Sequence, residues 1–202
     1  MTDTAATPKS SRERILEAAI HLFAYQGYEN TSTLSIARAA HTSETQLVKN
    51  FNNKEGLLQA ACDQVVIELA GIVPEVQHIS GPREKLREFF NRALRMLDDN
   101  PEYKMILLLD TRRVRRKTGG AVLVPPAAPA FLNLIDGILD EARVAGQLKP
   151  GLRSQLIRSA IFGAVGELLR DPLAAEDSVT GSVTTEEVQE VLDHMLSCFF
   201  VS

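Results

Sequence analysis

Apolar side chains recur at the three- and four-residue spacing of amphipathic helices along most of the chain, and polar or Gly- and Pro-containing stretches separate these segments. The first segment begins after Ser10 or Ser11, since either hydroxyl can cap a helix, and Gly27 is placed to end it. Two short segments follow, at 33–40 and 44–51. Each is too short to be stable alone, so both must pack on the first helix.

Longer segments in the remainder of the chain predict a helical bundle. Pro74 is expected to stop the first of these helices, and Asn100–Pro101 is expected to break another. The expected helices run from Lys54 to about Ile72, from Pro82 to Asn100, around 105–109, and over 128–145, 152–170 and 188–199. We therefore predict an all-α protein of about nine helices, with a disordered arm at 1–9, a first domain over 1–53 and a larger second domain over 54–202.

The segment at 152–170 has apolar residues most of the way round the helix, which predicts burial on more than one side. It is too short to span a membrane, so its second side is expected to meet another subunit. Gly163 and Gly166 permit a close approach there. We therefore predict a homodimer whose interface is formed by Phe162, Gly163, Gly166, Leu169, Val188, Leu192, Met195 and Phe199.

Composition narrows the class of protein. The 202 residues are 45% hydrophobic with a net charge of −4, which permits a sizeable core and argues against a polycation that coats nucleic acid. Cys62 and Cys198 lack metal-ligand spacing and the histidines are scattered, so no metal or cofactor is expected. Because no catalytic motif occurs, an enzyme is not expected. The chain shows no signal core and no apolar run near roughly 18 residues, so we predict a cytoplasmic protein without a membrane partner.

Three short helices, the last two separated by about three residues, are the pattern of a helix-turn-helix unit. The residues that carry the pattern are Arg14, Ile15, Leu16, Ala18, Ala19, Leu22, Phe23, Gly27, Tyr28, Thr31, Ser32, Ile36, Ala37, Ala40, Ser43, Leu47, Phe51, Lys54, Glu55, Leu57 and Leu58. In type and spacing, without gaps, this stretch resembles the TetR family of repressors. The resemblance implies a DNA-binding domain at 1–53 and a ligand-binding, dimer-forming body.

The resemblance turns the second short helix and the third, recognition helix into a candidate DNA surface. Ser32 and Ser43 can cap these helices, which leaves backbone N–H groups free for a phosphate. Side chains that project outward from the recognition helix can reach base edges or phosphates in the major groove. The predicted DNA contacts are Ser32, Thr33, Ser43, Glu44, Thr45, Gln46, Lys49, Asn50 and Lys54. Gln46 and Asn50 suit adenine, Lys49 suits guanine or phosphate, and Lys54 matches the position where the family touches the DNA backbone.

Four positions depart from the family pattern. His41 stands where the family has a turn glycine, and a histidine tolerates left-handed geometry better than most residues do. Thr42 replaces a buried valine. Val48 and Asn50 replace tyrosines that contact phosphate or support the recognition helix. Residues 1–55 also carry six basic and six acidic residues, so DNA affinity must rest on a few placed contacts.

The body contains apolar and charged residues that are candidates for effector binding. Seven apolar residues are candidates to line an effector pocket, and together they favour an apolar small molecule: Phe89, Phe90, Met96, Met105, Leu108, Phe131 and Phe162. For each of them, ordinary packing in the core is the alternative. The basic run from Arg112 to Lys117 is either a solvated helix end or a site for an anion or DNA. Asp110 and Glu167 are carboxylates that must pair or reach a ligand or partner.

Two functions follow from these patterns. The leading one is a ligand-responsive, DNA-binding transcriptional regulator, a repressor that a small molecule releases from its double-stranded operator. The alternative is a dimeric helical module that binds a ligand or a protein and no longer recognises DNA. The neutral N-terminal domain and the missing tyrosines favour this alternative slightly.

Overall fold

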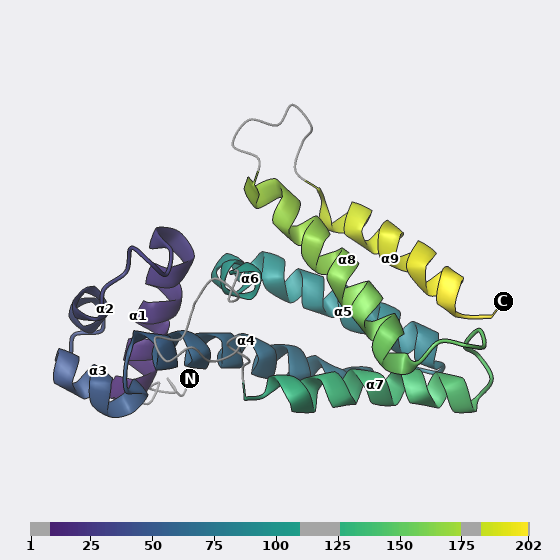
Figure 1. Cartoon of the computed structure of the whole chain (residues 1–202), viewed down its shortest axis with the longest axis horizontal. Helices are drawn as coiled ribbons and strands as arrows, with labels where there is room; N and C mark the ends of the chain where they lie inside the picture. The colour runs from purple at the N-terminus through teal and green to yellow at the C-terminus, as the bar shows by residue number, and fades with distance from the viewer. Residues whose placement is uncertain (1–8, 110–125, 175–182, 202) are drawn as a thin grey trace, which may run out of the picture. The chain divides into compact units, whose positions relative to one another are not determined.

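The computed structural model describes residues 9–109, 126–174 and 183–201, and these residues contain nine helices, whose arrangement can be followed in Figure 1. The predicted all-α fold is confirmed. The helices are α1 (Ser11–Gln26), α2 (Thr33–Ala39), α3 (Glu44–Phe51), α4 (Lys54–Val76), α5 (Pro82–Asp99), α6 (Pro101–Leu108), α7 (Ala128–Val144), α8 (Ser154–Ala174) and α9 (Thr185–Phe199). Residues 1–8 of the predicted arm at 1–9, Asp110 and the basic run Arg112 to Lys117 lie outside the described residues.

The described residues form two compact units. The first contains residues 9–65 and 102–109, and the second contains 66–101, 126–174 and 183–201. The first unit therefore extends beyond the predicted domain 1–53, because the N-terminal half of α4 belongs to it. Leu57, Leu58 and Ala61 in that half are fully buried.

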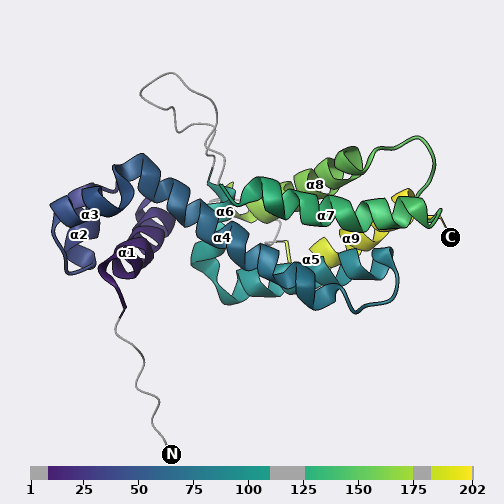
Figure 2. The ribbon, with the colours of Figure 1, turned by 90° about the horizontal axis from the view of Figure 1, so that it is seen from below.

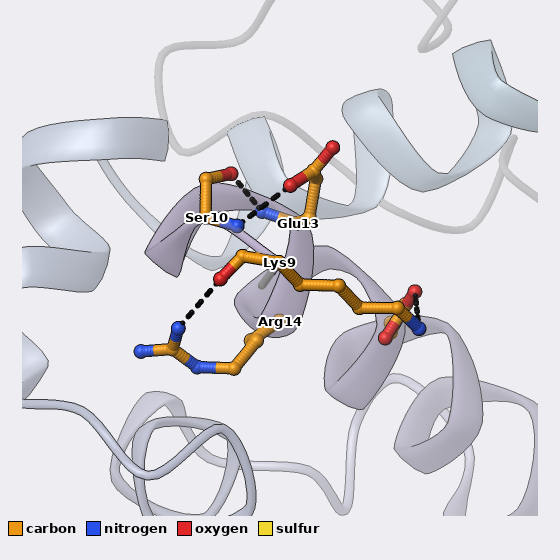
Figure 3. A network of polar contacts seen from close by, with 5 residues as sticks. Lys9, Ser10, Glu13 and Arg14 are labelled. Carbon is orange, nitrogen blue, oxygen red and sulfur yellow. Dashed lines mark hydrogen bonds and ion pairs between the residues drawn. The ribbon is translucent and has the colours of Figure 1, made fainter. Parts of the chain in front are cut away.

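Helix α1 begins at a capping box formed by Ser10 and Glu13 (Figure 3). The Ser10 hydroxyl accepts a hydrogen bond from the Glu13 N–H at 3.2 Å, and the Glu13 carboxylate accepts one from the Ser10 N–H at 2.7 Å. This hydrogen bonding to Ser10 lowers the pKa of Glu13. Arg14 then donates to the carbonyls of Lys9 at 2.8 Å and Ala40 at 3.2 Å, which ties the start of α1 to the end of α2.

The turn between α2 and α3 uses a histidine in left-handed geometry. His41 has a φ of 51° and donates its N–H to Arg38, while Thr42 donates to Ala37 at 2.9 Å. These two bonds form a Schellman motif, in which the residue after the C-cap is usually glycine. The predicted left-handed histidine is therefore present, and it strains the turn that orients α3.

The turn between α3 and α4 depends on a close backbone approach. A Cβ on Gly56 would lie 2.2 Å from the carbonyl oxygen of Phe51, so only glycine fits. Asn53 accepts a hydrogen bond from the Gly56 N–H at 2.8 Å through its side-chain oxygen, which satisfies the first turn of α4.

Helix α4 is longer than predicted, because it continues through Pro74 to Val76. A proline inside a helix removes one backbone hydrogen bond. Here the loss falls in the last turn, where buried Val73 and Val76 hold the chain in place.

By length and composition α4 could also cross a membrane, with a mean hydropathy of 1.5, contrary to the prediction that no apolar run reaches that length. Half of that stretch is buried within the protein, and core helices of soluble proteins share this composition.

Four helices of the second unit pack in a ring. Helix α5 packs against α7 and α9, and α8 packs against the same two helices (Figures 1 and 2). Backbone bonds from Lys149 to Phe199 at 2.9 Å and from Val201 to Gln147 at 2.8 Å join the end of α9 to the α7–α8 connection. Most side chains inside the ring are apolar, and the ring helices carry five of the seven candidate effector residues: Phe89, Phe90, Met96, Phe131 and Phe162.

The strained turn generates a stability prediction. We expect His41→Gly to raise the free energy of unfolding by about 0.5–1 kcal/mol, because the cost of a Cβ at positive φ exceeds the backbone entropy that glycine adds. Urea unfolding followed by circular dichroism measures the change. His41→Ala is the control, since it removes the ring but keeps the Cβ. Equal effects of the two substitutions would contradict the strain.

Candidate nucleic-acid interface

The two short helices of the first unit are capped as predicted. The Ser32 hydroxyl accepts a hydrogen bond from the Ser35 N–H at 3.0 Å. In return, the Ser35 hydroxyl accepts one from the Ser32 N–H at 3.1 Å. Ser43 accepts from the Gln46 N–H at 3.1 Å. Each cap satisfies one of the free N–H groups at its helix start and leaves the others for water or an anion.

Helix α3 has one buried face and one polar, solvent-exposed face. Leu47 and Phe51 are buried against the unit, and the exposed side chains are Glu44, Thr45, Val48 and Lys49. Gln46 and Asn50 are half-buried at the edge of this face. The Asn50 amide donates to the Gln46 carbonyl at 2.8 Å. The residues of α3 that are predicted to contact DNA bases therefore share one surface, and the exposed side chain of Val48 lies among them.

A carboxylate joins the starts of the two short helices. The Thr33 hydroxyl donates to Glu44, so two of the predicted DNA contacts are hydrogen-bonded to each other. A negative charge at the first turn of α3 interacts favourably with the helix dipole. It also places a carboxylate on the surface where we predict DNA to bind.

Lys54 has partners that the sequence did not indicate. Its ammonium donates to the carbonyls of Tyr28 at 2.7 Å and Thr31 at 2.9 Å, and it lies 3.4 Å from that of Glu29. It also lies 4.3 Å from the centre of the Tyr28 ring. An ammonium has three donors, so the loop before α2 occupies them. The predicted contact of Lys54 with the DNA backbone stays a prediction, and its contacts here make it a positioning residue for Ser32.

The aromatic partner of Lys54 is itself partly buried. Burial raises the pKa of Tyr28, and the carboxylates of Glu55 and Glu29 add to this effect. Tyr28 therefore keeps its proton at neutral pH, and its ring packs 5.3 Å from that of Phe23 in the first unit. A lysine above a neutral phenol is a stable arrangement, because the ring face attracts the cation.

Sequence reasoning missed Arg12 as a basic group of this unit. Its guanidinium lies 5.2 Å from the centre of the Phe51 ring, the last residue of the recognition helix, and its side chain is exposed. Arg38 in the last turn of α2 is also exposed. The helical spacing from Ser10 could have indicated that Arg12 lies outside the core, but only the fold places it beside α3.

Four of the seven predicted effector residues meet in the second unit. Phe89 and Phe90 of α5, Phe131 of α7 and Phe162 of α8 form a cluster, with ring centres 5.2 to 5.9 Å apart. We call these residues the phenylalanine cluster. Met96 is half-buried on α5, whereas Met105 and Leu108 lie on α6 in the first unit. The set is therefore divided, and a role in ligand binding stays a prediction.

The predicted dimer residues divide between the core and the surface of the protomer. Leu169, Val188 and Leu192 are buried inside the second unit, because the regular stripe on α9 packs against α5 and α8. Gly163 is exposed, and Phe162, Gly166, Met195 and Phe199 are half-buried. Leu156 of α8 and Val191 of α9 are exposed apolar residues that were not among the predicted interface residues. Glu167 is also exposed and pairs with Arg170 at 2.5 Å.

Two family models together match most of the chain. Residues 15–61 match the model of bacterial regulatory proteins of the tetR family, and residues 63–194 match that of the YsiA-like protein C-terminal region. The chain belongs to the TetR family. The predicted function is confirmed at this level: it is a helix-turn-helix transcriptional regulator with a DNA-binding N-terminal domain and a ligand-responsive body.

Individual relatives agree with this assignment. The fatty acid metabolism regulator protein of Bacillus subtilis (strain 168) is 25% identical over 159 residues, which cover 76% of this chain and 79% of that protein. The structure of the fatty acid degradation regulator FadR from Bacillus halodurans matches with a TM-score of 0.78 at 22% identity, covering 92% and 97% of the two chains. Bacillus subtilis FadR in complex with stearoyl-CoA matches with a TM-score of 0.74 at 21% identity, covering 91% and 95%.

Lys49 is the exposed cation of the recognition helix, which generates a DNA-binding prediction. We expect Lys49→Ala to weaken DNA binding, and to lower the slope of log affinity against log salt by about 1 if it contacts a phosphate. The free energy of unfolding should stay within about 0.5 kcal/mol of the wild type. The charge-matched control is Lys149→Ala in the second unit. DNA binding by electrophoretic mobility shift over a salt series checks this, and an unchanged affinity contradicts it.

Lys54 generates a different prediction, because its ammonium bonds the protein itself. We expect Lys54→Met to lower the free energy of unfolding by about 1–3 kcal/mol, since it leaves loop carbonyls without their charged donor. Methionine keeps an apolar stem over Tyr28, so the loss reports the ammonium. Urea unfolding measures the free energy of unfolding of Lys54→Met, with Lys49→Ala as the comparison. A variant with wild-type stability that no longer binds DNA would instead assign Lys54 to the phosphate backbone.

Proposed function

We propose that this regulator is a homodimeric repressor that a long-chain acyl-CoA releases from its operator. The observation that carries the proposal is the similarity to the fatty acid metabolism regulator, which extends over 79% of that protein and includes the body. The solved complex of a FadR with stearoyl-CoA supports the class of effector, since its fold matches over 91% of this chain. We further infer that the protein acts in the cytoplasm, where its operator is.

The DNA side of the proposal rests on the exposed face of α3. Each protomer of a dimer presents one such face, and two faces match half-sites about one helical turn apart, near 34–36 Å. Lys49 supplies the positive charge, while Thr45, Gln46 and Asn50 supply hydrogen-bonding groups of suitable length for base edges. Because the N-terminal domain is neutral, binding depends on these placed contacts and on the two capped helix starts.

The effector side rests on the phenylalanine cluster. Four mutually packed rings from three helices form an apolar cluster, and aromatic side chains of this kind commonly line sites for apolar ligands such as an acyl chain. A ligand changes DNA binding only if it binds one conformation of the body better than another. Insertion of a chain among rings that already contact one another meets this condition, because the rings must separate to admit it.

The alternative of a binding module that does not recognise DNA keeps one supporting observation. The ammonium of Lys54 is bound by loop carbonyls, so the cation that matches the family's backbone contact is not presented freely. A module of this kind would still bind the acyl-CoA. Retention of specific genomic DNA fragments by the full-length protein separates the two functions.

The test uses the full-length protein and sheared genomic DNA at low salt. We expect specific fragments to be retained and sequenced, and stearoyl-CoA to release them, whereas coenzyme A alone does not. Retention should fall steeply with salt. Failure to retain any specific fragment would overturn the repressor and support the module. Retention that stearoyl-CoA does not change would overturn the proposed effector.

A further inference from the structure

An ion pair between α7 and α8 is unusual in its surroundings. The Nε of Arg158 lies 3.1 Å from the Oδ1 of Asp136, and their side chains are only 15% and 13% exposed. Both atoms are sealed from solvent, and neither makes a hydrogen bond within the described residues. The two charges are therefore close, but the N–H of Arg158 is not directed at the carboxylate.

Such a pair is costly unless other groups satisfy it. The Nε–H of Arg158 is shielded from water and has no acceptor in line with it among the described residues, so this donor is left unsatisfied. Lys85 of the same unit shows the usual solution, because its ammonium donates to both oxygens of Glu141 at 2.8 and 2.9 Å. Arg158 lacks a comparable set of acceptors in the described residues. Its arrangement suits a side chain that is held ready for another anion.

The pair also adjoins the phenylalanine cluster. Arg158 and Phe162 are four residues apart on α8, so they lie on the same face of that helix. Across the α7–α8 contact, Phe162 packs 5.9 Å from Phe131, while Asp136 is one to two turns further along α7. One further turn along α8, the Ser154 hydroxyl donates to Asp140 at 2.5 Å and closes the seam. A mostly buried cation thus lies one helical turn from the phenylalanine cluster.

We propose that Arg158 binds the anionic group of an acyl ligand whose chain enters the phenylalanine cluster, and that Asp136 holds the guanidinium until that ligand binds. A planar guanidinium matches a carboxylate or a phosphate with two parallel hydrogen bonds. The acceptors that Arg158 lacks are those that such a group supplies. This inference deepens the proposed function and rests on its acyl effector.

The test compares two substitutions that break the same ion pair. Arg158→Gln removes the cation, whereas Asp136→Asn removes only its competitor. We expect Arg158→Gln to weaken binding of hexadecanoate or palmitoyl-CoA by about tenfold or more and to leave binding of the uncharged hexadecan-1-ol within about twofold. Asp136→Asn should retain or increase the affinity for the anionic probes. Arg143→Gln is the control, since it breaks an exposed pair with Asp140 on α7.

Displacement of a fluorescent fatty acid from the full-length protein gives the affinities. If Arg158→Gln weakens binding of hexadecanoate alone, Arg158 binds a free carboxylate. If it weakens binding of palmitoyl-CoA, Arg158 binds the phosphates of the coenzyme. Either result supports the inference. Equal weakening of all three probes by both substitutions would show a structural tie and overturn it, as would a wild type that binds neither anion. If Arg158→Gln does not fold, Arg158→Lys replaces it, because it keeps the charge and loses the paired donors. Anion binding that does not release DNA overturns only the proposed effector.

Discussion

Burial of one face of each short helix against α1 is the interaction on which the candidate DNA-binding surface depends. Helices of seven and eight residues do not persist alone in water, so α2 and α3 exist because Ile36, Leu47 and Phe51 are buried in the first unit. The serine caps, the strained turn at His41 and the loop held by Lys54 then set the direction of each helix. The outward face of α3, which we propose contacts DNA, is exposed as a consequence of how its inward face is packed.

Local features of this fold could be predicted from the sequence, and contacts between distant segments could not. The caps at Ser32 and Ser43 follow from residue type beside an apolar repeat, and the structure confirms them. Pro74 misled the prediction, because packing of the last turn outweighed the lost hydrogen bond. The carbonyl partners of Lys54 lie 23 to 26 residues away, so no periodic pattern reveals them.

The same limit applies to the second unit. The helical stripe on α9 indicated that Val188 and Leu192 are buried, but not whether a partner or the protomer itself covers them. The phenylalanines could be selected by type alone, and the fold brought four of them together and left Met105 and Leu108 in another unit. The pairing of Asp136 with Arg158 could not be predicted from the sequence, because it depends on the packing of α7 against α8 and on the burial of both side chains.

Glu44 gives the recognition surface a property that its cations do not provide. If α3 contacts DNA as we propose, the Glu44 carboxylate, held at the start of α3 by the Thr33 hydroxyl, repels a phosphate placed beside it and can accept a hydrogen bond from the amino group of a cytosine. Discrimination between DNA sequences then comes partly from repulsion, because a duplex in the wrong register brings a phosphate close to this carboxylate and is bound less tightly. On the proposed function, an N-terminal domain of zero net charge with a carboxylate on its DNA-facing helix is expected to bind random DNA more weakly than a basic domain of the same shape.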